Sequence, residues 1–209
     1  MEKLFLFIGV IFALNVTAQS QYEKGMSKAL ELMNQGKFTE SSNLFERISN
    51  AEKDNWLPSF YVGYLNVIAS FGIKDEAKLT SNIEKARTFL NKANAISPNN
   101  PEIMIIQALA NTAYIAFDGQ KYGMTLSGKN AQIYAKALQI APNNPRVISS
   151  KAEWDMGGAK FFGQSTEPFC KDIKRAIKLF KEEKNIEKFH PGWGLNRAEQ
   201  VLKESCGKK

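Results

Sequence analysis

Apolar residues recur every three or four positions along most of this 209-residue chain, the spacing that places side chains on one face of an α-helix. Between residues 103 and 114, for example, Ile103, Ile106, Ala110 and Tyr114 form such a stripe. No stretch keeps the alternation of apolar and polar residues that is typical of a β-strand, so we predict an all-α protein. The pattern predicts helices at residues 22–34, 39–51, 56–71, 81–96, 101–117, 128–140, 145–162, 168–184 and 195–205.

Two identical turns divide this pattern into repeating units. The sequence Pro-Asn-Asn-Pro occurs at residues 98–101 and 142–145, 44 residues apart, and each copy follows an apolar helical stretch. The second proline of each copy suits the first turn of a helix, because the N–H that proline lacks would have no helical partner there. Repeats of this length predict stacked helical hairpins.

The segment at residues 34–41 connects these repeats with a known family. Its sequence, Asn-Gln-Gly-Lys-Phe-Thr-Glu-Ser, is followed by Leu44, Phe45 and Ile48 and resembles the centre of a tetratricopeptide repeat (TPR), where a Gly-x-aromatic turn joins two helices. The small residue that the family has in the first helix of each repeat is matched by Ala29, Gly63, Ala108 and Ala152. The resemblance implies a TPR-like α-solenoid of four helical hairpins plus a C-terminal capping helix.

The repeats are longer than those of the family. Phe45, Leu90, Tyr134 and Phe180 match the aromatic position of the family and are 45, 44 and 46 residues apart. TPR units repeat about every 34 residues. We assign the surplus to lengthened loops between the two helices of repeats two to four, at residues 72–78, 119–127 and 162–168, and we expect these loops to carry part of the binding specificity.

The first eighteen residues have the features of a signal peptide. Lys3 provides a positive start, residues 4–14 are an apolar run, and residues 16–18 are small enough for cleavage. The run is shorter than the about 20 residues that span a bilayer. A buried first helix is the alternative, but the run has no polar face. We therefore expect removal of residues 1–18, and a single exported domain at residues 19–209 without a membrane segment, periplasmic or alternatively extracellular.

The chain is basic, with a net charge of +7, and most of the excess lies from Arg146 onward. From Cys170 to Lys184 the apolar residues share one side of a helix, and lysine and arginine residues share the other side. A solvated helix face explains this pattern. Because the basic residues are not interleaved with aromatic residues, we predict no nucleic-acid partner.

Few residues could carry chemistry. His190 is the only histidine and lies between Phe189 and Pro191, so we favour packing of an aromatic loop over a catalytic or metal-binding role. One histidine and two cysteines 36 positions apart lack the paired spacing of metal ligands. No acid–base pair has a neighbour that would tune its ionisation. We therefore predict no metal, no cofactor and no enzymatic activity.

Cys170 and Cys206 are the only cysteines of the chain. In an exported protein such a pair is a candidate for a disulfide. The bridge would attach the last helix to the fourth hairpin. Two buried free thiols are the alternative.

The first helix of each hairpin lines the concave side of a TPR-like solenoid. Aligning the hairpins on their small residues gives ten candidate binding residues on this side: Met26, Leu30, Met33, Phe60, Tyr64, Val67, Ile105, Leu109, Arg146 and Glu153. Most are apolar or aromatic, so we do not expect the cluster of Lys, Arg and Asn with which some TPR domains bind a terminal carboxylate. Such a groove either stays partly open for a partner, the interpretation that we prefer, or closes on itself as core.

These features favour a non-enzymatic, exported adaptor that binds a protein or peptide partner in the cell envelope through its apolar concave groove. The alternative is a binding protein for a small ligand or a glycan, with Tyr64, Trp154 or Trp193 as stacking platforms. Loss of protein partners after Phe60→Ala or Tyr64→Ala would favour the adaptor. A small molecule that raises the melting temperature would favour the alternative.

Overall fold

The computed structural model describes residues 21–184 and 187–207, and every regular element among them is helical. The all-α class is thus confirmed for this part of the chain, whereas the expected signal peptide lies outside the described residues. A first helix covers residues 21–34. It is followed by α2 (Phe38–Ala51), α3 (Trp56–Ile68), α4 (Glu76–Ile96), α5 (Pro101–Phe117), α6 (Gly119–Ile140), α7 (Pro145–Phe161), the 3₁₀ helix η1 (Glu167–Phe169), α8 (Cys170–Glu182) and α9 (Leu195–Ser205).

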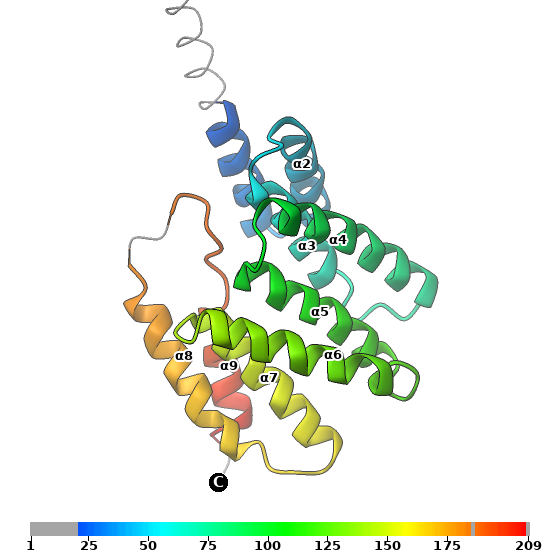
Figure 1. The fold of residues 1–209 in the computed structure, drawn as a ribbon, viewed down its shortest axis with the longest axis vertical. Helices are drawn as coiled ribbons and strands as arrows, with labels where there is room; N and C mark the ends of the chain where they lie inside the picture. Colours follow the sequence, from blue (N-terminus) through cyan, green and yellow to red (C-terminus); the bar gives the residue numbers. More distant parts are fainter. Residues whose placement is uncertain (1–20, 185–186, 208–209) are drawn as a thin grey trace, which may run out of the picture.

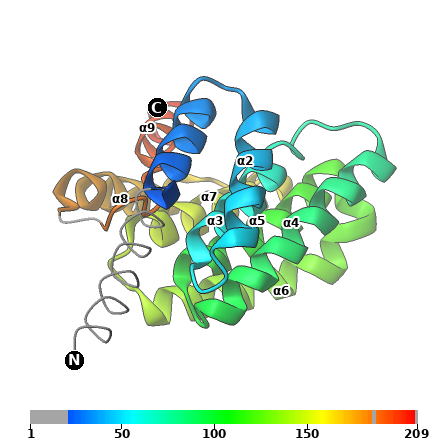
Figure 2. The same ribbon diagram turned by 90° about the horizontal axis from the view of Figure 1, so that it is seen from above.

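Successive helices pack as hairpins, most extensively α3 with α4 and α5 with α6. The hairpin of residues 21–34 and α2 is linked by a hydrogen bond from Ser41 Oγ to the carbonyl oxygen of Ala29 (2.8 Å). The first helices of neighbouring hairpins also contact each other, α3 with α5 and α5 with α7, and α9 packs on α8 (Figure 1, Figure 2). We call the surface formed by residues 21–34, α3, α5 and α7 the inner face.

The two Pro-Asn-Asn-Pro turns set the starts of α5 and α7. In each turn the second asparagine is the N-cap: the side chain of Asn100 accepts a hydrogen bond from the Glu102 N–H (2.9 Å), and that of Asn144 accepts one from the Arg146 N–H (2.9 Å). The prolines that follow, Pro101 and Pro145, are the first helical residues. The predicted starts of both helices are confirmed, because an asparagine cap and a first-turn proline agree on the boundary.

The expected loop at residues 119–127 is wrong, and the one expected at residues 72–78 ends earlier than predicted, at Asp75. Helix α4 already begins at Glu76, and α6 begins at Gly119, directly after Asp118. The reason is capping by aspartate: Asp75 accepts from the Lys78 N–H (2.7 Å), and Asp118 accepts from the N–H groups of Gln120 (3.1 Å) and Lys121 (3.0 Å). The extra residues of the third repeat therefore lengthen a helix, those of the second repeat are divided between a short loop and α4, and residues 162–168 are mostly loop.

Small residues allow the helices to approach closely. Ala29, Ala108 and Ala152 are all buried. At Gly63 a Cβ atom would lie 2.6 Å from Leu90 Cγ of α4 and 3.3 Å from the Ala86 carbonyl oxygen. Residues of the first three hairpins and of α7 thus share one hydrophobic core, and a second cluster joins α7, α8 and α9.

Candidate functional site

A short segment between α8 and α9 lies across the inner face. We call residues 187–194 the strap; it is the orange part of the chain that leads into α9 in Figure 1. The hydroxyl of Tyr61 on α3 donates a hydrogen bond to the carbonyl oxygen of Phe189 (2.9 Å). The ring of Phe189 also meets that of Tyr22 edge-on, with centroids 5.8 Å apart. The strap is therefore packed on the first two hairpins, more than a hundred residues away in sequence.

Aromatic side chains of α3 and of the strap form one cluster. Trp56, Phe60 and Tyr64 are four residues apart and so lie along one stripe of α3. The strap covers both ends of this row: His190 packs against Trp56 (6.2 Å between centroids), and Trp193 stacks on Tyr64 (5.5 Å, with 26° between the ring planes). The rings of Phe60 and Tyr64 are nearly parallel, at 11° and 6.2 Å. Trp56, Phe60 and Tyr64 form the aromatic row of the inner face, and the strap packs against both of its ends.

Both ends of the strap make close contacts with the rest of the protein. At its start, Lys188 Nζ is 2.6 Å from Oε2 of Glu23. At its end, Gly194 has a φ angle of 116°, and a Cβ atom there would lie 2.5 Å from Cζ of Phe180. Only glycine fits this conformation and this gap.

A buried ion cluster lies beside the end of the strap. The Arg146 guanidinium on α7 donates through Nε to Glu102 on α5 (2.9 Å), and it binds both carboxylate oxygens of Glu183 (2.5 and 3.0 Å). Burial alone would lower the pKa of Arg146, but the hydrogen bonds and charges of the two glutamates outweigh it and raise the pKa. The positive charge of Arg146 is thus balanced by Glu102 and Glu183, so Arg146 does not present a free cation to a ligand.

The structure brings the ten candidate binding residues to the inner face, and none of them is exposed. Five are buried: Met26, Phe60, Val67, Ile105 and Arg146. Five are partly buried: Leu30, Met33, Tyr64, Leu109 and Glu153. Eight of the ten belong to the main hydrophobic cluster, which also includes Phe189 and Trp193 of the strap. The protein's own C-terminal segment therefore covers part of this face.

Burial raises the pKa of three ionisable groups at this face. Burial raises the pKa of Tyr64, and burial together with the negative charge of Glu102 raises the pKa of Tyr61. Burial also raises the pKa of the Glu153 carboxyl, against the opposing effect of Arg197, whose Nε is 2.8 Å from Glu153 Oε2. Burial therefore disfavours the charged forms of these three groups.

Three buried side-chain polar atoms make no hydrogen bond within the described part of the chain. They are Nδ1 of His190, Nε1 of Trp193 and Oε2 of Glu102. The first two belong to the strap, and Glu102 is bound to Arg146, whose Cγ lies 3.5 Å from the Cβ position of Gly194. All three thus lie at or next to the contact between the strap and the inner face.

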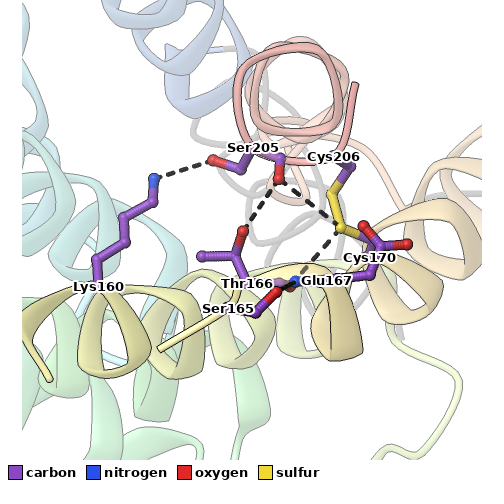
Figure 3. Close-up of a disulfide and its surroundings, with 7 residues drawn as sticks. All are labelled: Lys160, Ser165, Thr166, Glu167, Cys170, Ser205 and Cys206. Carbon is purple, nitrogen blue, oxygen red and sulfur yellow. Dashed lines mark hydrogen bonds between the residues drawn. A yellow bond between two sulfur atoms is a disulfide. The ribbon is translucent and has the colours of Figure 1, made fainter. Parts of the chain in front are cut away.

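A disulfide fixes the helix that follows the strap. Cys170 at the start of α8 and Cys206 after α9 are bridged, with an S–S distance of 2.08 Å (Figure 3). Around the bridge, Thr166 Oγ1 donates to the Ser205 carbonyl oxygen (3.0 Å), and Lys160 Nζ donates to Ser205 Oγ (3.0 Å). The end of α9 is therefore attached to both α7 and α8.

The described residues hold no group of three or more His, Cys, Asp or Glu side chains that could bind a metal ion. None of the described helices combines the length and the hydropathy needed to cross a membrane. An open depression of about 440 Å³ lies beside the strap, but it is lined by polar residues such as Glu23, Lys28 and Lys188 and not by the aromatic row.

Comparison with known proteins gives one similar structure. No protein-family model matches the chain, and no curated protein matches it. Among solved structures, the chain is similar to the HusA haemophore from Porphyromonas gingivalis, with a TM-score of 0.78 and 21% sequence identity over 90% of this chain and 95% of that chain. At this identity the similarity concerns the fold.

The structure brings together two of the three residues that the sequence suggested as stacking platforms. Tyr64 and Trp193, named as stacking platforms for the ligand-binding alternative, are in contact, whereas Trp154 packs towards Tyr134 of α6 (6.4 Å). Trp56 was missed, although its four-residue spacing from Phe60 was visible in the sequence. The contact of the strap with α3 had no sequence signal, because nothing local encodes a pairing over 128 positions.

Proposed function

We propose that this protein is a non-enzymatic, exported binding protein for a flat aromatic ligand of the tetrapyrrole class, the class to which haem belongs. The observation that carries the proposal is the match to a haemophore along 95% of that chain. The ligand is cargo, bound without chemical change. A periplasmic or extracellular location goes with this proposal, because both are compartments in which an exported binding protein meets free ligand.

The residues of the inner face fit such a ligand. A tetrapyrrole needs a large apolar contact surface and a ring to stack on. The aromatic row of α3 offers both, and the indole of Trp193 on Tyr64 is itself an example of a flat ring in this position. Arg146 is already paired, so recognition would rest on the ring system more than on carboxylate groups.

The adaptor that the sequence favoured is supported less well. A helix or extended peptide needs an open groove of several residues' length, whereas none of the ten candidate residues is exposed. The TPR-like pattern of turns and small residues explains the hairpins equally well for either function. A polypeptide partner is therefore the second candidate.

The direct test is a titration of residues 19–209 with hemin and, separately, with metal-free protoporphyrin IX. We expect saturable binding of both, seen as a shift of the porphyrin absorption band and as quenching of tryptophan emission, and a higher melting temperature. Tyr64→Ala should weaken binding, and Phe162→Ala, which removes an aromatic ring that is 73% exposed, should not. Absence of saturable binding for both compounds would overturn the proposal.

A further inference from the structure

We infer that the indole of Trp193 occupies the position that the ligand takes on the ring of Tyr64, so that binding requires the strap to leave the inner face. The inference rests on the tetrapyrrole-binding function proposed above and names its binding position. The position is the face of Tyr64 at the end of the aromatic row of α3.

The contact between the two rings is the first support. The rings of Trp193 and Tyr64 are nearly parallel, and the ring of Phe60 is nearly parallel to that of Tyr64. A stacking surface therefore already exists there. A tetrapyrrole stacked on Tyr64 would use the same flat π surface over a larger area. Because two groups cannot occupy the same volume, the ligand and the Trp193 indole exclude each other.

Unpaired polar atoms are the second support. Trp193 Nε1 and His190 Nδ1 are buried in the closed strap without a hydrogen-bond partner among the described residues. A buried polar group without a partner is less stable than the same group in water, because it has lost its hydration without gaining a hydrogen bond. Opening of the strap would expose both atoms to water, which brings the free energy of the open form closer to that of the closed form.

Backbone conformation is the third support. Phe189 has a φ angle of 66°, in the left-handed region that disfavours residues other than glycine. A non-glycine residue is destabilised there, because its Cβ atom comes too close to the following carbonyl oxygen. The hydrogen bond from Tyr61 and the contact with Tyr22 maintain this conformation, and both are lost when the strap moves away. The closed strap is therefore strained as well as incompletely hydrogen-bonded.

The strap can move without separating the hairpins. On its N-terminal side, Glu183 is held by Arg146 of α7. On its C-terminal side, α9 is attached to α8 by the disulfide between Cys170 and Cys206. Both flanks thus remain fixed while residues 187–194 change position.

Competition between an internal group and a ligand has a measurable consequence. If the strap is open in only a fraction of the molecules, the apparent affinity equals the intrinsic affinity multiplied by that fraction. Removal of the Trp193 indole should therefore increase the apparent affinity, whereas removal of the Tyr64 ring should reduce it. If Trp193 instead contacted the bound ligand, removal of its indole would weaken binding.

The experiment compares Trp193→Ala, Tyr64→Ala and the control Phe162→Ala in titrations with metal-free protoporphyrin IX, after circular dichroism has shown that each variant is folded. We expect about tenfold tighter binding for Trp193→Ala and at least about tenfold weaker binding for Tyr64→Ala, with the control unchanged. Unchanged or weaker binding by Trp193→Ala would overturn the inference and leave the proposed function intact.

A second measurement tests the strap without any ligand. Amide hydrogen exchange of the wild-type protein should show that the strap opens locally, so that the amide of His190, which donates to the Glu187 carbonyl oxygen (2.9 Å), exchanges much faster than the amides of α3. Exchange of this amide only at the rate of global unfolding would overturn the inference even if the wild-type protein binds no tetrapyrrole. Failure of the proposed function would instead appear as absence of binding by every variant.

Discussion

Arg146 on α7 donates through Nε to Oε1 of Glu102 on α5, 2.9 Å away, and both side chains are almost completely buried, with exposed fractions of 1% and 3%. The pair joins the third and fourth hairpins. Asn144 Nδ2 donates to the same Glu102 oxygen (2.7 Å), so the cap of α7 also takes part. A buried charge without its partner is costly, which makes this pair a sensitive point of the fold.

Replacement of Arg146 by methionine should lower the free energy of unfolding by about 3–5 kcal/mol, because Glu102 would keep a buried charge without its guanidinium partner. Addition of Glu102→Gln should recover part of this loss. Urea unfolding of the two single variants and the double variant measures the coupling. Strictly additive losses would show that the two residues do not stabilise each other.

Removal of the disulfide should destabilise the C-terminal part of the protein. The bridge closes a loop with a sequence separation of 36 residues, for which loop entropy predicts a loss of about 3–4 kcal/mol. The double variant Cys170→Ser and Cys206→Ser and the wild-type protein treated with a reductant should show the same lower unfolding midpoint. An unchanged midpoint in both would mean that the bridge does not constrain the unfolded chain.

Two glycines in helices should respond in opposite ways to alanine. Gly63→Ala should destabilise the protein by about 1–3 kcal/mol, since its Cβ would lie 2.6 Å from Leu90 Cγ. Gly157→Ala should stabilise it by about 0.5–1 kcal/mol, because Gly157 lies in α7 with nothing within 4 Å of an added Cβ. Thermal unfolding of both variants checks the pair, and equal shifts would contradict the close approach of α3 and α4.

Glu153 should make stability depend on pH. Because burial raises its pKa in the folded protein, the folded state binds this proton at pH values where the unfolded state has lost it. The free energy of unfolding therefore contains a component that decreases as pH rises from the ordinary glutamate pKa through the raised one, and is constant above it. Glu153→Gln should lack this component while keeping an oxygen for Arg197.

The stability difference between Glu153→Gln and the wild-type protein should consequently change in favour of the variant as pH rises from about 4 to about 8. Chemical unfolding at a series of pH values measures this difference. Groups with a lowered pKa, such as Glu31 and Glu76, are common to both proteins and cancel. A difference that is constant with pH would show that Glu153 titrates normally.

Helix boundaries were predictable where two local signals agreed. The starts of α5 and α7 follow from an asparagine cap and a proline, and Leu195–Ser205 was predicted as a helix with the bounds that the structure has. The loop predicted at residues 119–127 was wrong because it was assigned from the surplus length of the repeat. The cap at Asp118 begins a helix there, and that helix accommodates Gly119, Gly123 and Gly128.

The candidate site was less predictable than the fold. Alignment of the hairpins on their small residues predicts which residues of a helix face inward, and it assigned Phe60, Tyr64 and Ile105 to the concave side. It does not show what covers that face, because the strap reaches it through contacts such as Tyr61 with Phe189. The burial of the ten candidate residues is thus a property of tertiary packing.

The contact between Tyr61 and Phe189 also bears on the order of folding. Hairpins join neighbouring segments and can form early, whereas this contact closes a loop of 128 residues and must wait for the hairpins between them. The strap is therefore expected to dock late during folding. Until it docks, the aromatic row of α3 is uncovered, so under the proposed function a tetrapyrrole present during folding would bind without any opening step.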